Sequence, residues 1–378
     1  MKKKQNTLIG INATCFSNRP SGAKNRFVGF FRHIFNVNQD LNFVVYMPAD
    51  CRLEKYFSKN QNVIFKRTPL KSTNPLQRFI FGLFYWYFEL RRMNFDIFES
   101  FNLPLVKNPL GMSLLTIHDI RHIREFSWFK CIKFIIHKRA IRQADSVITV
   151  SNSMRSEILE IFPETEITVI YNGINQSIKK DFDDQNHSIL TQHKIEKPFI
   201  LTVGHFEKRK NYANLLEAIK LYQKKYDSSL SLVIVGNDNG DLGRIRKKIK
   251  KLSMNNSVSI LSGIGDTELV SLYSSAELFV FPSLYEGFGI PILESFQNEC
   301  PIITSNINVF KEITENQILY FDPHSCEDIV EKIRCIRSSA QIKSRIIKYG
   351  KSRAFAFNYQ SLADDYNNVY SDLLHNDS

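Results

Sequence analysis

Two carboxylates stand eight residues apart in the stretch "FPSLYEGFGIPILESF", residues 281–296. Glu286 enters a glycine-flanked turn, and Glu294 follows Pro291, a residue that favours the first turn of a helix. This order predicts a loop that leads into a helix, with one carboxylate before the helix start and one after it. Two acids in that arrangement can hold the two ends of a ligand.

The turn between the two acids is suited to a phosphate group. Gly287 and Gly289 allow close approach to the backbone, and the amides of Phe288, Gly289 and Ile290 are free to bind a diphosphate at the helix N-terminus. Taken singly, Glu286 would more simply be a turn residue and Glu294 a helix-favouring acid. The combination favours a nucleotide-sugar site, because that ligand carries hydroxyls on both sides of a diphosphate.

A second pair of charged residues follows another apolar run. The strand-like "PFILTVG" leads into "HFEKRKNYANLLEAI", which places Arg209 and Lys210 at the expected start of a helix. Cations are disfavoured there by the helix dipole unless an anion is bound, so a solvated first turn is the weaker interpretation. The helix itself is predicted by an apolar stripe at Tyr212, Leu215, Leu216, Ile219, Tyr222 and Tyr226.

The composition sets the scale of the molecule that positions these residues. The chain has 378 residues, 43% of them hydrophobic, which is enough for two ordinary cores. Its six cysteines show no paired spacing for zinc or for a disulfide framework, and the start "MKKKQNTLIGINATC" is expected to be a strand, not a leader. A reducing, cytoplasmic location is therefore expected.

Short β-branched and aromatic runs alternate with longer segments throughout the chain. In the first half they are "TLIGINAT", "NFVVYM", "NVIFK", "FDIFES", "SLLTIHD", "SVITVS" and "ITVIYNG"; in the second half they are "PFILTVG", "LSLVIVG", "VSIL", "LFVFPS", "PIITS" and "QILYF". Strands separated by helical spacers predict parallel sheets, so the fold class is α/β with two Rossmann-like, doubly wound domains. Ligands of such domains bind at the carboxyl ends of the strands.

The polar stretch between the halves marks the domain boundary. We expect an N-terminal domain over 1–176, a linker over 177–197 and a C-terminal domain over 198–355. The last segment, 356–378, is expected to be a helix that could pack on either domain, including back on the first.

The motif "EGFGIPILE" resembles the E-x7-E signature of the family 4 retaining glycosyltransferases. Other segments resemble the family in the expected order, from residue 8 to residue 375: "TIHDIRH", "ADSVITVSNSMRSEI", "VIYNGIN", "VGHFEKRKN", "GIGDTELVSLYSSAELFVFPSLYEGFG" and "ILYFDP". The resemblance implies the GT-B architecture, in which two Rossmann-like domains face each other across a cleft. It also implies transfer of a sugar from a nucleotide-sugar donor.

The resemblance assigns roles to the residues of the second domain. Glu294 matches the glutamate that holds the nucleotide ribose, Glu286 the one that faces the donor sugar, and Lys210 the lysine that neutralises the diphosphate. The stretch Phe288, Gly289 and Ile290 matches the backbone beside phosphate and sugar. Glu286 is expected to position the donor, not to act as a nucleophile.

The chain departs from the family beside its "VG" motif, where many members carry an arginine and this chain has His205. Arg209 is the candidate replacement for that second cation. In the first domain, His118 of "TIHD" matches a histidine at the sugar-binding face, although a lone histidine would more often be structural. Asp119 beside it could orient the loop. Gly22, in the loop "SNRPSGAKNRF" with Lys24, matches the loop that approaches donor phosphate and acceptor.

Catalysis by such a site is electrostatic. The transition state is oxocarbenium-like with charge growing on the diphosphate, and fixed cations and amides aimed at that charge lower the barrier. No metal and no cofactor are expected, because "DFDD" at 181–184 lies in the predicted linker and is interpreted as a solvated turn. The resemblance implies retention of anomeric configuration by front-face attack.

The formal net charge of +12 calls for an anionic partner. Residues 121–142 hold seven Lys or Arg against one acid, and residues 79–88 hold seven aromatics beside Arg78, Arg91 and Arg92. At least half of the rings in 79–88 are expected in the core, yet the paired pattern favours peripheral contact with an anionic membrane face. The apolar run 79–88 is too short to cross a bilayer.

The leading interpretation is a cytoplasmic, peripheral membrane hexosyltransferase. It would act on a lipid-linked or saccharide acceptor in O-antigen, capsule or exopolysaccharide synthesis, with GDP-mannose as the first candidate donor. A sugar-nucleotide 2-epimerase on the same architecture would convert the nucleotide sugar without an acceptor. A nucleic-acid-binding protein would explain the charge, but no motif supports it, so no nucleic acid is expected as a partner.

Overall fold

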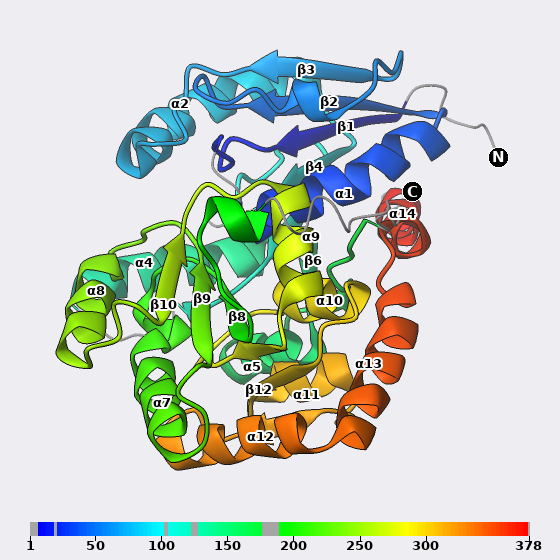
Figure 1. The fold of residues 1–378 in the computed structure, drawn as a ribbon. Coiled ribbons are helices and arrows are strands. Elements are labelled where there is room, and N and C mark those ends of the chain that lie inside the picture. Colours follow the sequence, from blue (N-terminus) through cyan, green and yellow to red (C-terminus); the bar gives the residue numbers. More distant parts are fainter. Residues whose placement is uncertain (1–6, 19–20, 102–104, 122–127, 176–188, 377–378) are drawn as a thin grey trace. The chain divides into compact units, whose positions relative to one another are not determined.

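The computed structural model describes residues 7–18, 21–101, 105–121, 128–175 and 189–376. The chain forms two compact units. Unit 1 comprises Met1–Asn175 together with Asn358–Ser378, and unit 2 comprises Gln176–Phe357. Each is an α/β domain built on a parallel sheet (Figure 1).

The sheet of unit 1 has seven strands in the order β3-β2-β1-β4-β5-β6-β7, and neighbouring strands are parallel. Its strands are nearly continuous runs of Val, Ile, Leu and Phe, as expected for a sheet covered on both faces. They are β1 (Thr7–Asn12), β2 (Leu41–Met47), β3 (Val63–Arg67), β4 (Ile97–Ser100), β5 (Met112–Ile117), β6 (Ser146–Thr149) and β7 (Ile167–Val169). The helices are α1 (Gly22–Val37), α2 (Pro75–Met93), α4 (Trp128–Gln143), α5 (Asn152–Ile161) and α14 (Tyr359–Asn376), with a 3-10 turn η1 at Glu54–Tyr56.

The last helix of the chain, α14, packs in the core of unit 1. The Tyr359 ring lies 5.0 Å from that of Phe30 on α1, and Tyr366 lies 5.6 Å from Phe31. A β-carbon at Gly29 would stand only 2.3 Å from the Tyr359 ring, so a small residue of α1 lets this helix approach. The chain therefore crosses from unit 2 back to unit 1 before it ends.

A buried carboxylate joins α14 to the sheet. Glu99 on β4 is fully buried and accepts hydrogen bonds from Thr116 Oγ1 at 2.8 Å, from Tyr370 Oη at 2.6 Å and from Tyr366 Oη. Burial raises the pKa of Glu99, and these three donors oppose the rise. Burial also raises the pKa of Tyr370 well above its usual value, so the phenol remains a donor. Buried polar groups of this kind are tolerated because each oxygen is satisfied.

Unit 2 repeats the architecture with six parallel strands in the order β10-β9-β8-β11-β12-β13. The strands are β8 (Phe199–Val203), β9 (Ser231–Val235), β10 (Val258–Leu261), β11 (Leu278–Phe281), β12 (Ile302–Ser305) and β13 (Leu319–Phe321). The helices are α7 (Tyr212–Lys225), α8 (Leu242–Lys251), α9 (Asp266–Ser275), α10 (Ile290–Gln297), α11 (Asn308–Thr314), α12 (Cys326–Ser338) and α13 (Ala340–Phe355), with a 3-10 turn η2 at Lys208–Lys210.

The predicted fold class is confirmed, and all thirteen predicted strands are present. The buried stripe of α7 is confirmed for Tyr212, Leu216 and Tyr222, but Tyr226 lies beyond the helix and is 52% exposed. Within the segment predicted as a linker, residues 176–188 lie outside the described residues. Residues 189–192 are helical, and Ile189 and Leu190 are buried.

The expectation that at least half of the rings in 79–88 are core residues is wrong. Trp86 of α2 is buried against Tyr46 and Phe98, and Tyr85 is half-buried. Four other rings of the segment are exposed, namely Phe81, Phe84, Tyr87 and Phe88. A helix that packs on one face of a sheet can bury only the stripe that faces it, whatever its composition. Within the described part of the chain, no helix combines the length and apolarity that crossing a bilayer requires.

The contact between α14 and the sheet can be tested by Tyr370→Phe. Removing the hydroxyl leaves buried Glu99 without one of its donors, so we expect the free energy of unfolding to fall by roughly 1–3 kcal/mol. Urea unfolding followed by circular dichroism measures the change. Tyr349→Phe is the matched control, because its hydroxyl bonds the exposed Glu315 carboxylate. Equal stability of the two variants would contradict this assignment.

Candidate functional site

The sheet order places two loops of unit 2 beside each other. Strands β8 and β11 are neighbours, yet their chains leave the sheet towards β9 and β12 on opposite sides, which is the switch point where open α/β sheets bind ligands. The loop after β8 carries Arg209 and Lys210, and the loop after β11 carries Ser283 and Glu286. The amide of Leu284 bonds the carbonyl of Arg209 at 2.8 Å, which ties the loops together.

The two cations do not lie in the first turn of α7, as the sequence predicted. They lie in the 3-10 turn η2, and Asn211 in the left-handed conformation (φ 58°) separates this turn from the helix. The Asn211 side chain donates to the carbonyl of Pro323 at 2.7 Å, which fixes the corner. The corner directs Lys210 inward, where it is 6% exposed.

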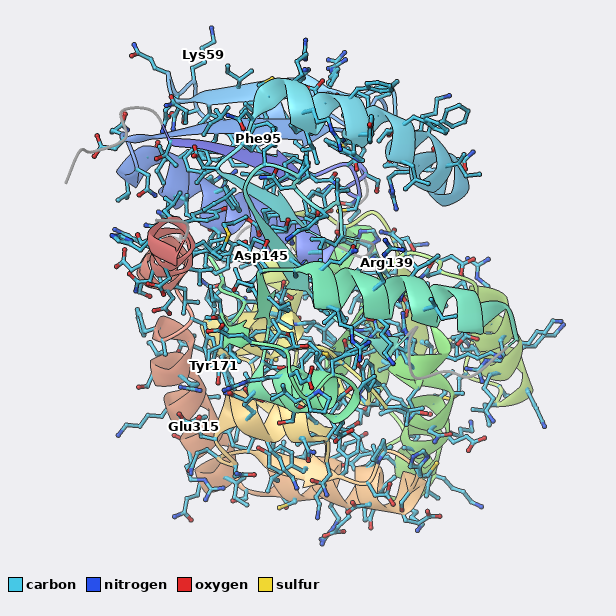
Figure 2. The ribbon with its side chains drawn as sticks, turned by 180° about the vertical axis from the view of Figure 1, so that it is seen from behind. Lys59, Phe95, Arg139, Asp145, Tyr171 and Glu315 are labelled. Atoms are coloured by element: carbon cyan, nitrogen blue, oxygen red, sulfur yellow. The ribbon has the colours of Figure 1, made fainter. Side chains whose placement is uncertain are left out.

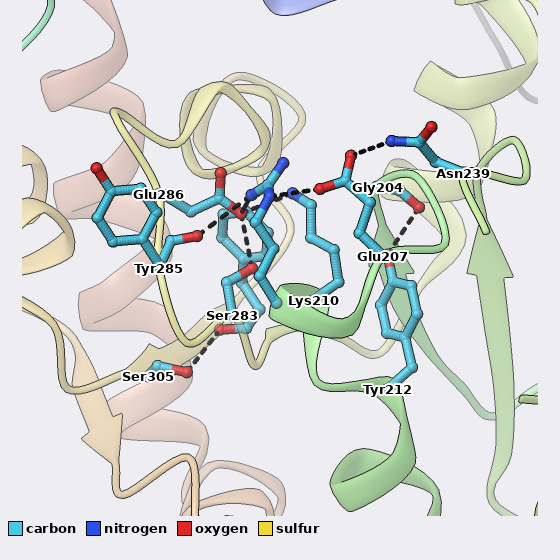
Figure 3. A network of polar contacts seen from close by, with 11 residues as sticks. Gly204, Glu207, Lys210, Tyr212, Asn239, Ser283, Tyr285, Glu286 and Ser305 are labelled. Carbon is cyan, nitrogen blue, oxygen red and sulfur yellow. Dashed lines mark hydrogen bonds and ion pairs between the residues drawn. The ribbon is translucent and has the colours of Figure 1, made fainter. Parts of the chain in front are cut away.

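Glu286 brings the two cations together (Figure 3). Its Oε1 lies 2.7 Å from Lys210 Nζ and 2.6 Å from Arg209 Nη1, and it accepts a hydrogen bond from Ser283 Oγ at 2.8 Å. The Lys210 ammonium also stands over the Phe281 ring, 4.8 Å from its centroid. All three charged side chains are largely buried, so their charges act in a medium of low dielectric constant.

Glu286, Lys210 and Arg209 form an ion cluster, and their pKa values follow from burial and charge. Burial alone would raise the pKa of Glu286, but the charges of Lys210 and Arg209 and the Ser283 hydroxyl outweigh it and hold this pKa below its usual value. Burial lowers the pKa of Lys210, with Glu286 opposing the shift. Burial acts downward on Arg209 as well, but the carboxylates of Glu286 and Glu207 raise its pKa. The carboxylate and the guanidinium are therefore charged at neutral pH.

A second carboxylate orients Arg209. Glu207 Oε2 accepts from Arg209 Nε at 2.7 Å, while Glu207 Oε1 accepts from Asn239 Nδ2 at 2.6 Å. Arg209 Nη1 also donates to the carbonyl of Tyr285 at 3.2 Å. These contacts hold the planar guanidinium in one orientation, as a preorganised anion site requires.

Two glycines shape the backbone around the cluster. Gly204, at the end of β8, has φ 153°, and a β-carbon there would stand 2.7 Å from Lys210 Cε. Gly289 has φ 140° and forms the N-cap of α10, with Pro291 in the first turn. The predicted helix start is therefore confirmed. Phe288 is buried at 4% exposure, its ring 5.9 Å from that of Phe357, so this residue offers its backbone more than its side chain.

Glu294 lies on α10, outside the ion cluster. Among the described residues its carboxylate has one donor, Tyr273 on α9, whose hydroxyl lies 2.9 Å from Oε2. Burial raises the pKa of Glu294 to about 6, and the Tyr273 hydroxyl opposes the rise. The carboxylate form therefore prevails above about pH 6, and its Oε1 can accept a ligand hydroxyl.

His205 and Arg209, the two candidates for the second cation, make different contacts. The His205 ring nitrogen Nδ1 lies 3.4 Å from the amide nitrogen of Asn237, from which it can accept a hydrogen bond at the end of β9. Arg209 shares its carboxylate partner, Glu286, with Lys210. Of the two candidates for the second cation, Arg209 is the one beside Lys210.

His118 lies in unit 1, directly after β5. Burial, together with the charge of Arg26, lowers its pKa to about 3, so the imidazole is neutral at physiological pH. Its Nε2 is buried and has no hydrogen-bond partner among the described residues. A neutral imidazole with a free nitrogen can bond a sugar hydroxyl but cannot supply a charge.

Gly22 is the first residue of α1, which Ser21 caps by accepting from the amide of Lys24 at 3.2 Å. The Lys24 ammonium turns back and donates to the carbonyls of Ser17 and Asn18, at 3.1 and 3.2 Å. Lys24 therefore holds the first loop in shape, and Gly22 is exposed at the N-terminus of α1.

No group of three or more His, Cys, Asp and Glu side chains that could hold a metal ion occurs in residues 7–18, 21–101, 105–121, 128–175 and 189–376. The acidic run 181–184 lies outside those residues. The charged groups that the described site offers are two cations and three carboxylates.

Sequence reasoning missed three supporting residues. Ser283 is visible in the quoted motif, three residues before Glu286, and its hydroxyl could have been expected to face the turn. Glu207 lies two residues before Arg209, but its second partner, Asn239, is brought near only by the fold. Tyr273 gave no signal, because its partner Glu294 is also brought near by the fold. Tyr273 stands 21 residues before Glu294, on a different helix.

The ion cluster predicts a pH-dependent effect of Lys210→Met. The depressed pKa of Glu286 means that its stabilisation is present above the unfolded-state pKa of about 4.3 and is lost as the pH falls through the folded value. Losing Lys210 should therefore lower the free energy of unfolding by roughly 3–5 kcal/mol near neutral pH, and by less at acidic pH.

Urea unfolding at a series of pH values measures this dependence. Lys208→Met is the matched control, since Lys208 belongs to the same 3-10 turn but is exposed. A loss of unfolding free energy in Lys210→Met that stays constant down to acidic pH would show that the pKa of Glu286 does not depend on this cation.

Comparison with known proteins identifies the class. The family model described as Glycosyltransferase Family 4 matches residues 37–177, and the model described as Glycosyl transferases group 1 matches residues 184–353. The O-antigen chain mannosyltransferase RfbU of Salmonella typhimurium is 29% identical over 252 residues, which span 65% of this chain and 66% of that protein. The O-antigen chain mannosyltransferase B of Escherichia coli is 24% identical over 284 residues, 72% of each chain.

The fold also has close counterparts among solved structures. Anabaena Alr3699/HepE, solved in complex with UDP and glucose, superposes with a TM-score of 0.75 at 15% identity, covering 96% of this chain and 99% of that one. This likeness concerns the fold. Because the two family models match consecutive stretches, residues 37–177 and 184–353, the protein belongs to glycosyltransferase family 4, and it has the GT-B fold.

Proposed function

We propose that this protein is a retaining hexosyltransferase that moves a sugar from a nucleotide-sugar donor to a lipid-linked or polysaccharide acceptor. The observation that carries the proposal is the pair of buried cations, Lys210 and Arg209, at the switch point of unit 2 beside the N-terminus of α10. Cations and helix amides together favour a diphosphate. A 2-epimerase is not favoured, because the reported relatives are transferases.

In this proposal the diphosphate takes over the cations from Glu286. Glu286 pairs with both Lys210 and Arg209 through one oxygen, as a phosphate oxygen would. A bound diphosphate would accept from both cations and from the amides of Phe288, Gly289 and Ile290, with His205 at the rim. Glu286 would then be free to bond hydroxyls of the donor sugar, which positions the anomeric carbon.

Glu294 would hold the ribose. Tyr273 occupies one carboxylate oxygen, so the other is left to accept from a ribose hydroxyl. Charge that grows on the diphosphate as the glycosidic bond breaks would be stabilised by Lys210 and Arg209, which are already oriented. The acceptor hydroxyl would attack from the face that the diphosphate leaves and pass its proton to the departing phosphate oxygen. The anomeric configuration would then be retained without a protein nucleophile and without a metal.

Unit 1 would supply the acceptor side. His118, neutral and with a free ring nitrogen, would bond a sugar hydroxyl, and Gly22 would let the donor phosphate or the acceptor approach the N-terminus of α1. A neutral imidazole is suited to orienting a hydroxyl, and its lowered pKa makes it a poor proton acceptor near neutral pH.

The substrates follow from the relatives. RfbU and mannosyltransferase B are both named for mannosyl transfer in the O-antigen chain, so GDP-mannose is the proposed donor and a surface polysaccharide the proposed product. Such acceptors are carried on lipid, which suits an enzyme held at the cytoplasmic face of the membrane. The net charge of +12 would favour an anionic surface.

Glu286→Gln separates binding from transfer. Nucleotide-diphosphate binding should be retained or strengthened, because the cations lose a competing anion, while transfer should fall by at least about a hundredfold. By contrast, Lys210→Ala and Glu294→Gln should weaken binding. A thermal-shift panel of GDP, UDP, ADP and their sugar conjugates measures binding, and radiolabelled sugar transfer measures turnover. Wild-type transfer by Glu286→Gln would refute its role.

Stereochemistry and metal dependence test the mechanism. The proton NMR coupling at the new linkage should show the anomeric configuration of the donor, and EDTA should leave the initial rate unchanged. An inverted product would require a general base in line with the acceptor and would overturn the front-face proposal. A rate lost in EDTA and restored by Mg²⁺ or Mn²⁺ would overturn metal independence.

A further inference from the structure

Helix α2 of unit 1 exposes an apolar face. Figure 2 shows the side chains of this unit as sticks. Six of the thirteen exposed large hydrophobic residues found in the described part of the chain belong to this one helix, so they form a patch and are not scattered. They are Ile80 at 45% exposure, Phe81 at 60%, Leu83 at 61%, Phe84 at 67%, Tyr87 at 54% and Phe88 at 68%. Leu83, Phe84, Tyr87 and Phe88 border an open hollow on its surface.

The opposite side of α2 is well packed, so the exposure does not reflect a poorly packed helix. Trp86 is 5% exposed and stacks edge-on against Tyr46 at 5.0 Å and Phe98 at 5.2 Å, while Leu90 is 2% exposed in the same cluster. Gly82 lies between Leu70 and the Trp86 ring. The helix is thus fixed to the sheet by one face and presents the other.

The outward side of α2 carries positive charges only. Its one acid, Glu89, is turned inward, where it accepts from Tyr46 Oη at 2.8 Å and pairs with Lys66 and Arg92. Burial would raise the pKa of Glu89, but these partners hold it below its usual value, so it stays charged. The outward side therefore carries aromatic and aliphatic groups with cations and no carboxylate.

The exposed cations lie at the C-terminal end of the patch. The Arg91 guanidinium stands over the Tyr87 ring, 3.9 Å from its centroid, and the Arg92 side chain is 65% exposed. Such a face fits the boundary between lipid headgroups and acyl chains, where rings and aliphatic groups enter the apolar layer and arginines bond phosphates. It does not fit a second copy, because the same face of that copy would offer Arg91 and Arg92 no carboxylate with which to pair.

We infer that α2 docks this enzyme on an anionic phospholipid bilayer by lying in the plane of the interface, with its apolar face inserted and Arg91 and Arg92 at the phosphates. This deepens the proposed function, because it identifies the part of the chain that makes the membrane contact. The inserted rings supply the larger share of the binding free energy, and the arginines supply the smaller share.

Vesicle co-sedimentation tests the inference, with phosphatidylcholine vesicles with and without phosphatidylglycerol. The double variant Phe84→Ser/Phe88→Ser should weaken partitioning by about a hundredfold, at roughly tenfold for each ring. Arg91→Gln should lower partitioning onto anionic vesicles by about fivefold and should change partitioning onto neutral vesicles little. High salt should weaken but not abolish binding of the wild type, because insertion is not screened.

The matched control is Phe355→Ser, which removes an equally exposed phenylalanine, 62% exposed on α13 of unit 2, and should bind vesicles like the wild type. Phe88→Trp reports directly on how deeply α2 enters the bilayer. Brominated lipids should quench the tryptophan fluorescence of this variant more strongly than that of the wild type. Retained secondary structure by circular dichroism shows that each variant folds.

Three results would overturn the inference: wild-type protein that binds neither vesicle, a double variant that binds like the wild type, or an unquenched Phe88→Trp. A dimer that the double variant dissolves, with no vesicle binding, would assign the face to a second copy. The donor site is tested independently of vesicle binding. The double variant should keep the thermal shift with GDP-mannose, and Lys210→Ala should keep vesicle binding. Vesicle binding without any nucleotide-sugar shift or turnover would refute the proposed function and leave α2 as the docking helix.

Discussion

One buried carboxylate organises the candidate donor site. Glu286 accepts from Lys210, Arg209 and Ser283 through a single oxygen, and so holds two cations close together where neither could stay charged alone at low cost. In the proposed mechanism, a diphosphate replaces Glu286 as the partner of these cations. Donor binding and the release of Glu286 toward the sugar would then be one event.

The cluster exists because the sheet of unit 2 is parallel and doubly wound. Lys210 and Glu286 are 76 residues apart in the chain, yet they follow neighbouring strands, β8 and β11. Crossover helices carry each strand back to the same end of the sheet, so every loop at that end is available to one ligand. Gly204 and Gly289 then permit backbone approaches that a side chain would block.

Unit 1 uses buried polar groups for a different purpose. Glu99 has three donors and carries no exposed oxygen, so it joins α14 to the sheet, and the rings of Tyr359 and Tyr366 complete the core around α1. On α2 the burial of Glu89 changes the charge of the surface. It removes the one negative charge from a helix face that otherwise consists of rings, aliphatic groups and arginines.

The sequence by itself determined the elements and much of the chemistry. Alternating apolar runs and helical spacers specify a parallel sheet, because their periods follow from local backbone geometry, and the acids, glycines and proline of 281–296 specify a loop that leads into a helix. Tertiary structure decided which groups meet. Lys210 meets Glu286, Asn239 meets Glu207 and Tyr273 meets Glu294 only when distant segments are brought together. The 3-10 turn at 208–210 turns Lys210 inward, although the pattern favoured a helix start. It also decided which rings of α2 face solvent, since seven aromatics in ten residues cannot all face one sheet, and only packing selects the stripe that does.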